Sequence, residues 1–301
     1  MIRIGYYPGC SLPGTAREYD ESVRALAPAI GIELVEVPDW NCCGATAAHN
    51  LNHELALALP ARILAIAERE GLDQILVPCA ACFSRLAGTR KELLNDNELK
   101  DRISKAIDMD YTGKAIPVNI LDVLSGISAG DISSKVTNPF NFATASYYGC
   151  LLSRPRDLVG IDRHEDPLVM EGILEAAGAR PLDWAFKVEC CGAGFSVSRT
   201  DIVGRLSAKI INDAVNRGAE AIIVACPMCH SNLDMRRPAI EKAANRKFEI
   251  PVLYITQAIG LALGLDFKKL GLHRHLVKVN LKPDPIVRAA GEGAPALEVE
   301  V

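Results

Sequence analysis

The sequence contains ten cysteines, and their spacing is the feature best able to do chemistry. They are Cys10, Cys42, Cys43, Cys79, Cys82, Cys150, Cys190, Cys191, Cys226 and Cys229. Four of them form two adjacent pairs, and neighbouring cysteines seldom satisfy disulfide geometry without strain. Disulfide frameworks also belong mainly to short secreted chains, whereas this sequence has 301 residues and opens as MIRIGYYPGC, without the pattern of a signal peptide. The thiols are therefore better explained as metal ligands or redox groups.

The ten cysteines fall into two sets of five in the same order, which predicts a duplication. Each set has a lone cysteine, an adjacent pair and a Cys-x-x-Cys, with 31 or 39 residues between the first two motifs and 35 or 34 between the last two. The flanking sequences repeat as well: YYPGC matches YYGC, DWNCCGA matches KVECCGA, and ILVPCAAC matches IIVACPMC. Corresponding cysteines lie 140, 148 and 147 residues apart, which suits two copies of one domain. We expect a first domain at 1–135, a second at 136–280 and a tail at 281–301, with the Gly/Ser/Asn/Pro-rich stretch 125–141 at the boundary.

Short apolar strands alternate with amphipathic helices in each half, and every cysteine motif follows a strand. The pattern predicts strands at Ile2–Tyr7, Ile32–Val37, Gln74–Val77, Thr144–Tyr148 and Ala221–Val224, and helices at Thr15–Ile30, Leu55–Glu70 and Val203–Arg217. This alternation is typical of α/β domains with mostly parallel sheets, whose functional groups gather at the carboxyl ends of the strands. The three cysteine motifs of each half are therefore expected to converge at one rim.

Composition and charge exclude several classes of protein. Apolar residues make up 49% and charged residues 23% of the chain, as in ordinary globular proteins. Lys plus Arg is 33 and Asp plus Glu is 37, so the net charge of −4 offers no general attraction to nucleic acid or anionic lipid. The sequence has no apolar run of the roughly 18 residues that a membrane span needs. We expect a cytoplasmic protein with neither a nucleic-acid partner nor a membrane span.

Each half offers five sulfurs, which is informative about the metal. A Cys-x-x-Cys at a strand-to-helix junction places two thiols at the positive end of a helix, and this lowers their pKa. Tetrahedral zinc and ordinary cubane clusters take four ligands. Five thiolates are therefore either one too many or suited to a larger, less regular cluster. A site with a spare thiolate could store electrons and bond transiently to a substrate sulfur.

The doubled arrangement, with Cys-Cys-Gly at its centre, resembles the CCG-domain signature, and residues 1 to about 265 resemble the B subunit of heterodisulfide reductase. The resemblance implies two tandem CCG domains and a catalytic protein that reduces, or reversibly forms, a disulfide. It also implies two non-cubane 4Fe-4S clusters that face one another across the duplication. Their ligands would be Cys10, Cys42, Cys43, Cys79 and Cys82 for the first, and Cys150, Cys190, Cys191, Cys226 and Cys229 for the second.

Partners follow from the same resemblance. It implies a flavin-containing A subunit that bifurcates electrons, a ferredoxin-like iron-sulfur C subunit through which they arrive, and a small-molecule or protein disulfide as substrate. The chain lacks a C-x2-C-x2-C-x3-C ferredoxin motif of its own, which agrees with electrons entering from partners. Leu151 follows Cys150 where methanogenic members have a histidine, and the second half is one residue short between its pair and its Cys-x-x-Cys. These departures favour the bacterial branches of the family.

Two alternatives to a disulfide-reducing subunit fit the same cysteine pattern. CCG domains also occur in electron-transfer subunits of lactate-, glycolate- or succinate-type dehydrogenase complexes. A zinc-stabilised assembly module without catalysis is the other, with zinc at the second site in particular, because zinc needs only four sulfurs.

Three histidines lie near the cysteine motifs. His49 and His53, four residues apart, are expected on one helical face, where they could orient substrate or donate a proton. His230 directly follows Cys229 and could hydrogen-bond around its cluster. Solvated surface histidines are the commoner case for the first two.

Three arginines are candidate substrate-binding residues. Arg154 and Arg156 follow Cys150, and Arg85 lies three residues after Cys82. The planar guanidinium fork suits a carboxylate or phosphate on a substrate. The alternative for all three is an exposed arginine without such a role.

Overall fold

Two four-stranded parallel sheets with the same strand order form the framework of the protein. The computed structural model describes residues 1–45, 48–161 and 163–281. The first sheet has the order β2-β1-β3-β4 and the second the order β6-β5-β7-β8, with parallel pairing throughout. The strands are β1 (Ile2–Tyr6), β2 (Ile32–Glu36), β3 (Gln74–Leu76), β4 (Ile116–Val118), β5 (Ala143–Tyr147), β6 (Arg180–Pro181), β7 (Ala221–Val224) and β8 (Val252–Tyr254). The predicted α/β fold and its duplication are confirmed.

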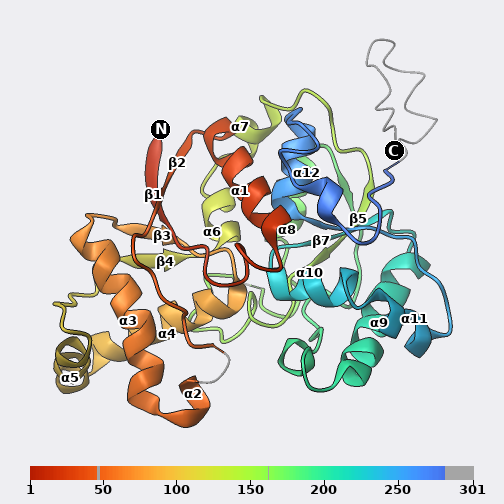
Figure 1. Ribbon diagram of the computed structural model, residues 1–301. Helices are drawn as coiled ribbons and strands as arrows, with labels where there is room; N and C mark the ends of the chain where they lie inside the picture. The colour runs from red at the N-terminus through yellow and green to blue at the C-terminus, as the bar shows by residue number, and fades with distance from the viewer. Residues whose placement is uncertain (46–47, 162, 282–301) are drawn as a thin grey trace.

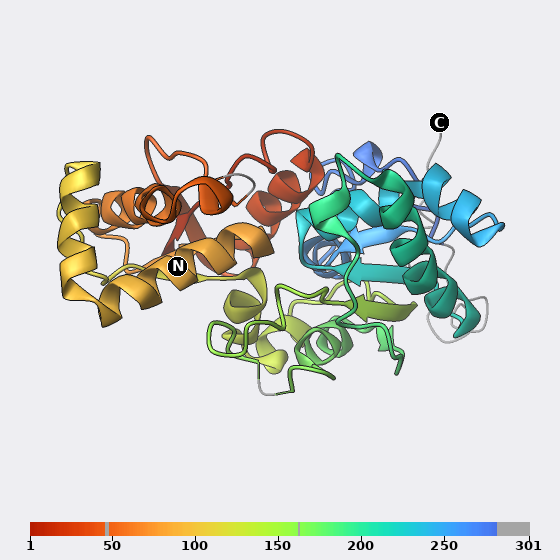
Figure 2. The same ribbon diagram turned by 90° about the horizontal axis from the view of Figure 1, so that it is seen from below.

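Helices cover the sheets, and the two halves lie side by side (Figures 1 and 2). The first half contributes α1 (Arg17–Ala29), α2 (Ala48–Leu51), α3 (His53–Arg69), α4 (Ala80–Asn95), α5 (Asn97–Ile107), α6 (Ile120–Ser125) and α7 (Ala129–Ser133). The second contributes α8 (Val169–Ala176), α9 (Thr200–Asn216), α10 (Pro227–Asp234), α11 (Arg237–Ala244) and α12 (Ile255–Ala262), with short 3-10 turns at Ala193–Phe195 and Leu272–Arg274. Because helices cover both faces, a central strand such as β7 is buried at all four positions and is apolar throughout.

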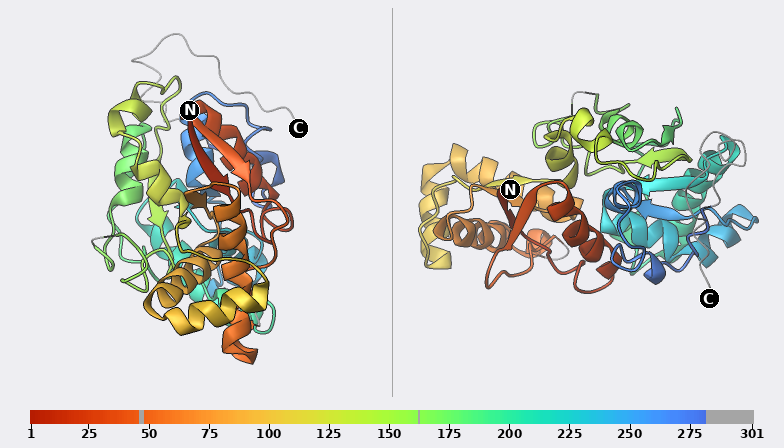
Figure 3. Two further views of the ribbon diagram at one scale, coloured as in Figure 1. Left: turned by 90° about the vertical axis from the view of Figure 1, so that its left-hand side faces the viewer. Right: turned by 90° about the horizontal axis from the view of Figure 1, so that it is seen from above.

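The halves meet along α1 and α12, which lie against each other (Figure 3). Tyr19 of α1 stacks on Tyr254, and the Ser22 hydroxyl lies 2.7 Å from that of Thr256. The stretch expected at the boundary contains α7, and both α6 and α7 pack against α8 of the second half. The boundary at residue 135 stays a prediction, and the tail beyond residue 281 lies outside the described residues.

The expectation that His49 and His53 share one helical face is wrong. His49 belongs to α2, which ends at Leu51, and His53 is the first residue of α3. The break occurs because the Asn52 side chain accepts a hydrogen bond from the Leu55 backbone N–H at 2.9 Å and thereby caps a new helix. The side chain of His49 lies outside the described part of the structure.

Across 1–45, 48–161 and 163–281, no helix combines the length and the apolar character needed to span a bilayer.

Candidate functional site

The cysteine motifs occupy the carboxyl ends of adjacent strands in both sheets. Cys10 follows β1, Cys42 follows β2, and Cys79 follows β3. β1 has β2 as its neighbour on one side and β3 on the other, so the strand order reverses at β1. Parallel α/β sheets bind ligands in the crevice at such a switch point. Cys150 after β5 and Cys226 after β7 repeat this arrangement in the second half. The expected convergence of the motifs therefore follows from strand order.

In the first half, the sulfurs form a connected group. The Sγ atoms of Cys43 and Cys82 are 3.1 Å apart. Cys42 lies within electrostatic range of both Cys10 and Cys43, and Cys79 lies within that of Cys82. All five cysteines predicted for this half are thus in one place, which we call the first cysteine set.

The second half repeats the arrangement. Cys150 and Cys190 have Sγ atoms 4.0 Å apart, and those of Cys191 and Cys229 are 3.8 Å apart. Cys229 and Cys150 both lie within electrostatic range of Cys226. These five form the second cysteine set.

The two sets meet at Cys79 and Cys226. Their thiols lie close enough across the boundary between the halves to shift each other's pKa, upward for Cys79 and downward for Cys226. Tyr19 supports this contact, because its hydroxyl donates to the carbonyl oxygen of Ala225, beside Cys226, at 3.1 Å. Two sets from separate halves therefore form one continuous group of thiols.

Each set has a buried inner side and an accessible outer side. Buried are Cys43, Cys79, Cys82, Cys191, Cys226 and Cys229; exposed or half-buried are Cys10, Cys42, Cys150 and Cys190. The lone cysteine and the first member of the pair are thus the accessible ones in both halves. In the residues that the structure describes, no three Cys, His, Asp or Glu side chains are arranged to hold a single metal ion.

A glycine close to each Cys-x-x-Cys allows the backbone to approach the sulfurs. Gly9 and Gly149 both have left-handed backbones, with φ of +61° and +66°. A Cβ atom would lie 3.1 Å from the Cys82 sulfur at the first position and 2.8 Å from the Cys229 sulfur at the second. Glycine is the residue that accepts both the conformation and the close contact.

Comparison with known proteins agrees with this geometry. The family described as CCG, cysteine-rich domain, matches residues 4–87 and 144–234, which include all ten cysteines. The chain belongs to the CCG cysteine-rich domain family. The resemblance stated from the sequence is confirmed.

Relatives of this CCG protein extend over nearly its whole length. It is 33% identical over 278 residues, covering 91% of this chain and 96% of the relative, to the protein of Wolinella succinogenes named 8-methylmenaquinol:fumarate reductase membrane anchor subunit. It is 30% identical to the B subunit of the ferredoxin/F(420)H(2)-dependent CoB-CoM heterodisulfide reductase of Methanosarcina acetivorans, covering 92% and 95% of the two chains. A solved structure of a hypothetical protein from Helicobacter pylori matches with a TM-score of 0.76 at 14% identity, over 92% of this chain and 52% of that one. The last comparison supports the fold alone.

Backbone N–H groups point at the exposed sulfur of each CCG pair. The N–H of Gly44 donates to Cys42 Sγ at 3.5 Å, and that of Gly192 donates to Cys190 Sγ at 3.3 Å. The repeated glycine of the Cys-Cys-Gly motif therefore supplies a hydrogen bond that favours the thiolate form in both halves.

Hydrogen bonds between neighbouring thiols also shift their pKa values. The pKa of Cys190 is lowered to about 6, chiefly by a hydrogen bond from Cys150, with backbone N–H groups adding to the effect. The pKa of Cys43 is lowered to about 7, chiefly by a hydrogen bond from Cys82. In each of these pairs one thiol favours the thiolate, the form in which cysteine binds metals. The pKa of its partner, Cys150 or Cys82, is raised chiefly by the same hydrogen bond.

Two tyrosines not singled out from the sequence stand beside the sulfurs. The Tyr7 hydroxyl donates to the carbonyl oxygen of Asn41 at 2.9 Å, and the Tyr147 hydroxyl donates to that of Glu189 at 2.6 Å. Each accepting residue directly precedes a cysteine pair. Burial, followed by the nearby cysteines, raises the pKa of both phenols. The repeated tyrosine before Gly-Cys was the sequence signal that could have identified them.

His230 lies in the interface between the halves. Its Nε2 donates to the Val252 carbonyl oxygen at 3.0 Å, and its ring stacks on Tyr254 with centroids 4.4 Å apart. Its Nδ1 lies 3.6 Å from a carboxylate oxygen of Glu18, and its Nε2 lies 3.3 Å from Nδ1 of His275. Burial lowers its pKa to about 3. These contacts support the framework of the second cysteine set.

The other candidate side chains are more exposed. Arg154 is ion-paired with Glu165, and Arg156 lies 3.7 Å from the same carboxylate. The His53 ring bonds to Glu92 at 2.7 Å and so links the start of α3 to α4. The structure therefore gives Arg154 and Arg156 an intramolecular partner.

Proposed function

We propose that this CCG protein is the catalytic iron-sulfur subunit of an oxidoreductase complex that reduces, or reversibly forms, a disulfide. The observation that carries the proposal is the contact between Cys79 and Cys226, which joins two five-cysteine sets into one group. Reduction of a disulfide consumes two electrons and two protons and releases two thiols. Two adjacent redox sites match this requirement when electrons arrive one at a time.

The chain's own residues fit two multi-iron clusters. The first would be held by Cys10, Cys42, Cys43, Cys79 and Cys82, and the second by Cys150, Cys190, Cys191, Cys226 and Cys229. Three features support the fit: five soft sulfur donors in each set, backbone N–H groups directed at the sulfurs, and the glycines that leave room beside Cys82 and Cys229. We assign a non-cubane 4Fe-4S cluster to each set.

When bound, such clusters supply single electrons and an iron atom that a substrate sulfur can approach. The protein positions the cysteine ligands and leaves some of them accessible to a substrate. The hydroxyls of Tyr7 and Tyr147 tie down the loops that carry the cysteine pairs. The accessible sulfurs of Cys10, Cys42 and Cys190 define the side from which a substrate reaches the group.

Partners are part of this proposal. Relatives named as heterodisulfide reductase subunits support membership of a multi-subunit complex. We assign electron delivery to a flavin-containing A subunit that passes electrons through a ferredoxin-like iron-sulfur C subunit. A disulfide of a small molecule or a protein would be the substrate.

A second candidate is favoured by the relative from Wolinella succinogenes at 33% identity, whose name places it in a fumarate reductase. In that case the same two cysteine sets would relay electrons between a quinone pool and a succinate-type dehydrogenase partner. The substrate would then be reduced on the partner. The disulfide-reducing function is preferred because several relatives carry the heterodisulfide reductase name.

Metal analysis of anaerobically purified protein is the first test. We expect about eight irons with equal acid-labile sulfide, two 4Fe-4S clusters per chain. Cys82→Ala and the matched Cys229→Ala should each lose about half of the iron, because each removes a buried ligand from one set. One or two zinc ions without iron would support an assembly module instead.

Catalysis separates the two redox candidates. With an artificial reductant, the protein should release thiols from disulfides, and added thiol should change its EPR signal. Electron transfer between a quinol and fumarate in a larger complex, without thiol release, would favour the second candidate.

A further inference from the structure

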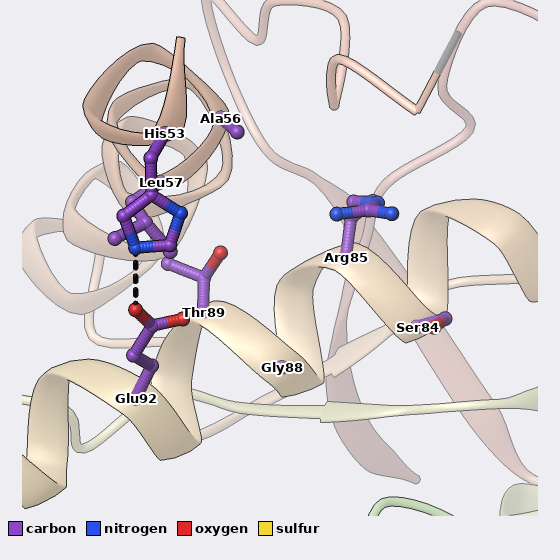
Figure 4. Close-up of a pocket in the computed structure, with 8 residues that line it drawn as sticks. All are labelled: His53, Ala56, Leu57, Ser84, Arg85, Gly88, Thr89 and Glu92. Atoms are coloured by element: carbon purple, nitrogen blue, oxygen red, sulfur yellow. Dashed lines mark hydrogen bonds and ion pairs between the residues drawn. The ribbon is translucent and has the colours of Figure 1, made fainter. Parts of the chain in front are cut away.

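A cavity of about 290 Å³ lies between α3 and α4, and its lining residues Ser84 and Arg85 come two and three residues after Cys82 in the sequence. Arg85 and Ser84 line it at the end nearer Cys82, and His53 and Glu92 line the other end (Figure 4). Leu57 is among the apolar side chains of its wall. Most of the lining residues are polar or charged, so the cavity suits a small polar or ionic ligand.

Arg85 is the basic residue of α4 that has no hydrogen-bond or ion-pair partner among the described residues. Lys91 on the same helix is paired with Asp157, and Arg90 donates to the Gly113 carbonyl oxygen at 3.0 Å. Arg85 has no hydrogen bond or ion pair with any residue of 1–45, 48–161 or 163–281.

The carboxylate in the cavity does not neutralise Arg85 either. Glu92 is engaged by His53 at 2.7 Å, and Figure 4 shows the guanidinium of Arg85 turned away from that pair. Within the described part of the chain, a half-buried arginine fork therefore faces the cavity with its donors unused. Such a fork binds a carboxylate through two parallel charge-assisted hydrogen bonds.

Arg85 also lies near Cys82 along α4. It follows Cys82 by one turn, which corresponds to a rise of about 4.5 Å along α4 and to the same helical face. A ligand held at Arg85 could thus extend a short chain toward the first cysteine set.

The second half lacks this cation. Its equivalent of Arg85, three residues after Cys229, is Asn232. Asn232 is fully buried, and its amide donates to the Cys191 carbonyl oxygen at 3.1 Å and to the Cys191 sulfur at 3.4 Å. The two halves therefore differ at this position: the first has Arg85, whose guanidinium can bind an anion, and the second has Asn232, whose amide bonds to a sulfur.

We propose that Arg85 binds the carboxylate of a thiol or disulfide substrate whose sulfur reacts at the first cysteine set. This inference rests on the proposed function and specifies its substrate class. An anionic substituent is recognised on one side of the disulfide only, because Asn232 replaces the arginine in the second half. Arg85 acts in binding, so its loss should raise KM for carboxylate-bearing substrates and leave the kinetics of substrates that lack the carboxylate unchanged.

Two disulfides of similar size test the proposal on the iron-sulfur-loaded protein with an artificial reductant. The probe is 3,3′-dithiodipropionate, which carries carboxylates, and the neutral comparison is bis(2-hydroxyethyl) disulfide. Arg85→Gln should raise KM for the dicarboxylate by about 10- to 100-fold, the range expected for lost charge-assisted hydrogen bonds. Kinetics with the neutral disulfide should not change, and Arg85→Lys should restore part of the loss. Arg69→Gln, at an exposed arginine near the end of α3, is the matched control and should behave as wild type.

Equal losses with both disulfides in Arg85→Gln, or a wild type that does not distinguish them, would overturn the inference. If neither disulfide is reduced, the proposed function is wrong, and carboxylate binding at Arg85 is then tested separately by a binding measurement. Calorimetric titration with 3-mercaptopropionate then decides. Binding that Arg85→Gln abolishes supports the carboxylate site, whereas binding that is absent or equal in both proteins overturns it.

Discussion

The ring of Tyr19 stacks on the ring of Tyr254, with centroids 3.9 Å apart and planes 5° from parallel. Tyr19 belongs to α1 of the first half, and Tyr254 ends β8 of the second. Both rings are fully buried, and the Tyr19 hydroxyl also bonds to the residue before Cys226. This stack therefore fixes the relative position of the two halves near the point where their cysteine sets touch.

Replacing Tyr19 should weaken the protein in a graded way. Tyr19→Ala removes a buried ring at the interface and should lower the free energy of unfolding by about 3–5 kcal/mol. Tyr19→Phe keeps the stack and loses only the hydroxyl bond to Ala225, so about 1 kcal/mol is expected. Anaerobic denaturant unfolding measures both. Equal losses in the two variants would show that the hydroxyl, and not the ring, holds the halves together.

The glycines close to the Cys-x-x-Cys motifs give a test of iron binding. Gly149→Ala should reduce the iron content, because its Cβ would lie 2.8 Å from the Cys229 sulfur, and Gly9→Ala should do so less, at 3.1 Å from Cys82. Gly31→Ala is the control. Gly31 also has a left-handed backbone, at φ +82°, but no described atom lies within 4 Å of its added Cβ.

Iron analysis and unfolding distinguish the two effects of these substitutions. Backbone strain of about 1–2 kcal/mol is expected in all three variants. Loss of iron is expected only beside the sulfurs. Full iron in Gly149→Ala, or an equal loss in Gly31→Ala, would contradict a role for these glycines in sulfur packing.

Local sequence signals account for what could be predicted of the fold. The apolar run of β7 and the helix that ends before Gly218 are set by residues close in sequence, so their positions were predicted within three residues. The cysteine sets were predictable because each motif follows a strand, and parallel strands bring their carboxyl ends to one edge. β4 and β8 were not predicted, since each has three residues and little periodicity.

The contacts between the halves could not be predicted from the sequence. Tyr19 and Tyr254 are far apart in the chain, and no local pattern links them. The helix break between His49 and His53 had a local signal, because Asn52 can cap a helix. The four-residue spacing of the two histidines nevertheless favoured one continuous helix. The lack of a partner for Arg85 could not be predicted either, because it depends on tertiary structure. Lys91 and Arg90 on the same helix have partners among the described residues, and Arg85 has none.

Stability should fall on mild acidification because of His275. Burial lowers the pKa of this histidine to about 3, and its Nε2 accepts a hydrogen bond from the Gln257 amide at 2.8 Å. The unfolded chain takes up a proton below its ordinary pKa of 6.5, whereas the folded protein does not. The contribution of His275 to the free energy of unfolding is thus fully present above pH 6.5 and is lost as the pH falls. One unit below that value the loss is about 1.4 kcal/mol.

Urea unfolding between pH 7.5 and 5.5 measures this loss. His275→Gln carries no titrating ring and should reduce the slope of stability against pH. His230 has the same lowered pKa and should retain its own contribution in that variant. An unchanged slope in His275→Gln would show that His275 does not contribute.

Asn232 should tune the second cysteine set independently of the first. Its amide donates to the Cys191 sulfur at 3.4 Å, while its oxygen accepts from the Ser196 hydroxyl at 2.8 Å. Asn232→Leu removes the donor, so the electron-rich reduced state loses a stabilising hydrogen bond, and the reduction potential of that site should fall. Stability should also fall by about 1–3 kcal/mol, because buried polar groups lose their partners.

Ser196→Ala separates the two effects of Asn232. This substitution removes the hydroxyl that bonds to the Asn232 oxygen and leaves the amide donor on the sulfur. EPR-monitored redox titration should therefore give a wild-type potential for Ser196→Ala and a lowered potential for one of the two sites in Asn232→Leu. If both variants shift the potential equally, the effect does not come from the hydrogen bond to the Cys191 sulfur, because Ser196→Ala leaves that hydrogen bond in place.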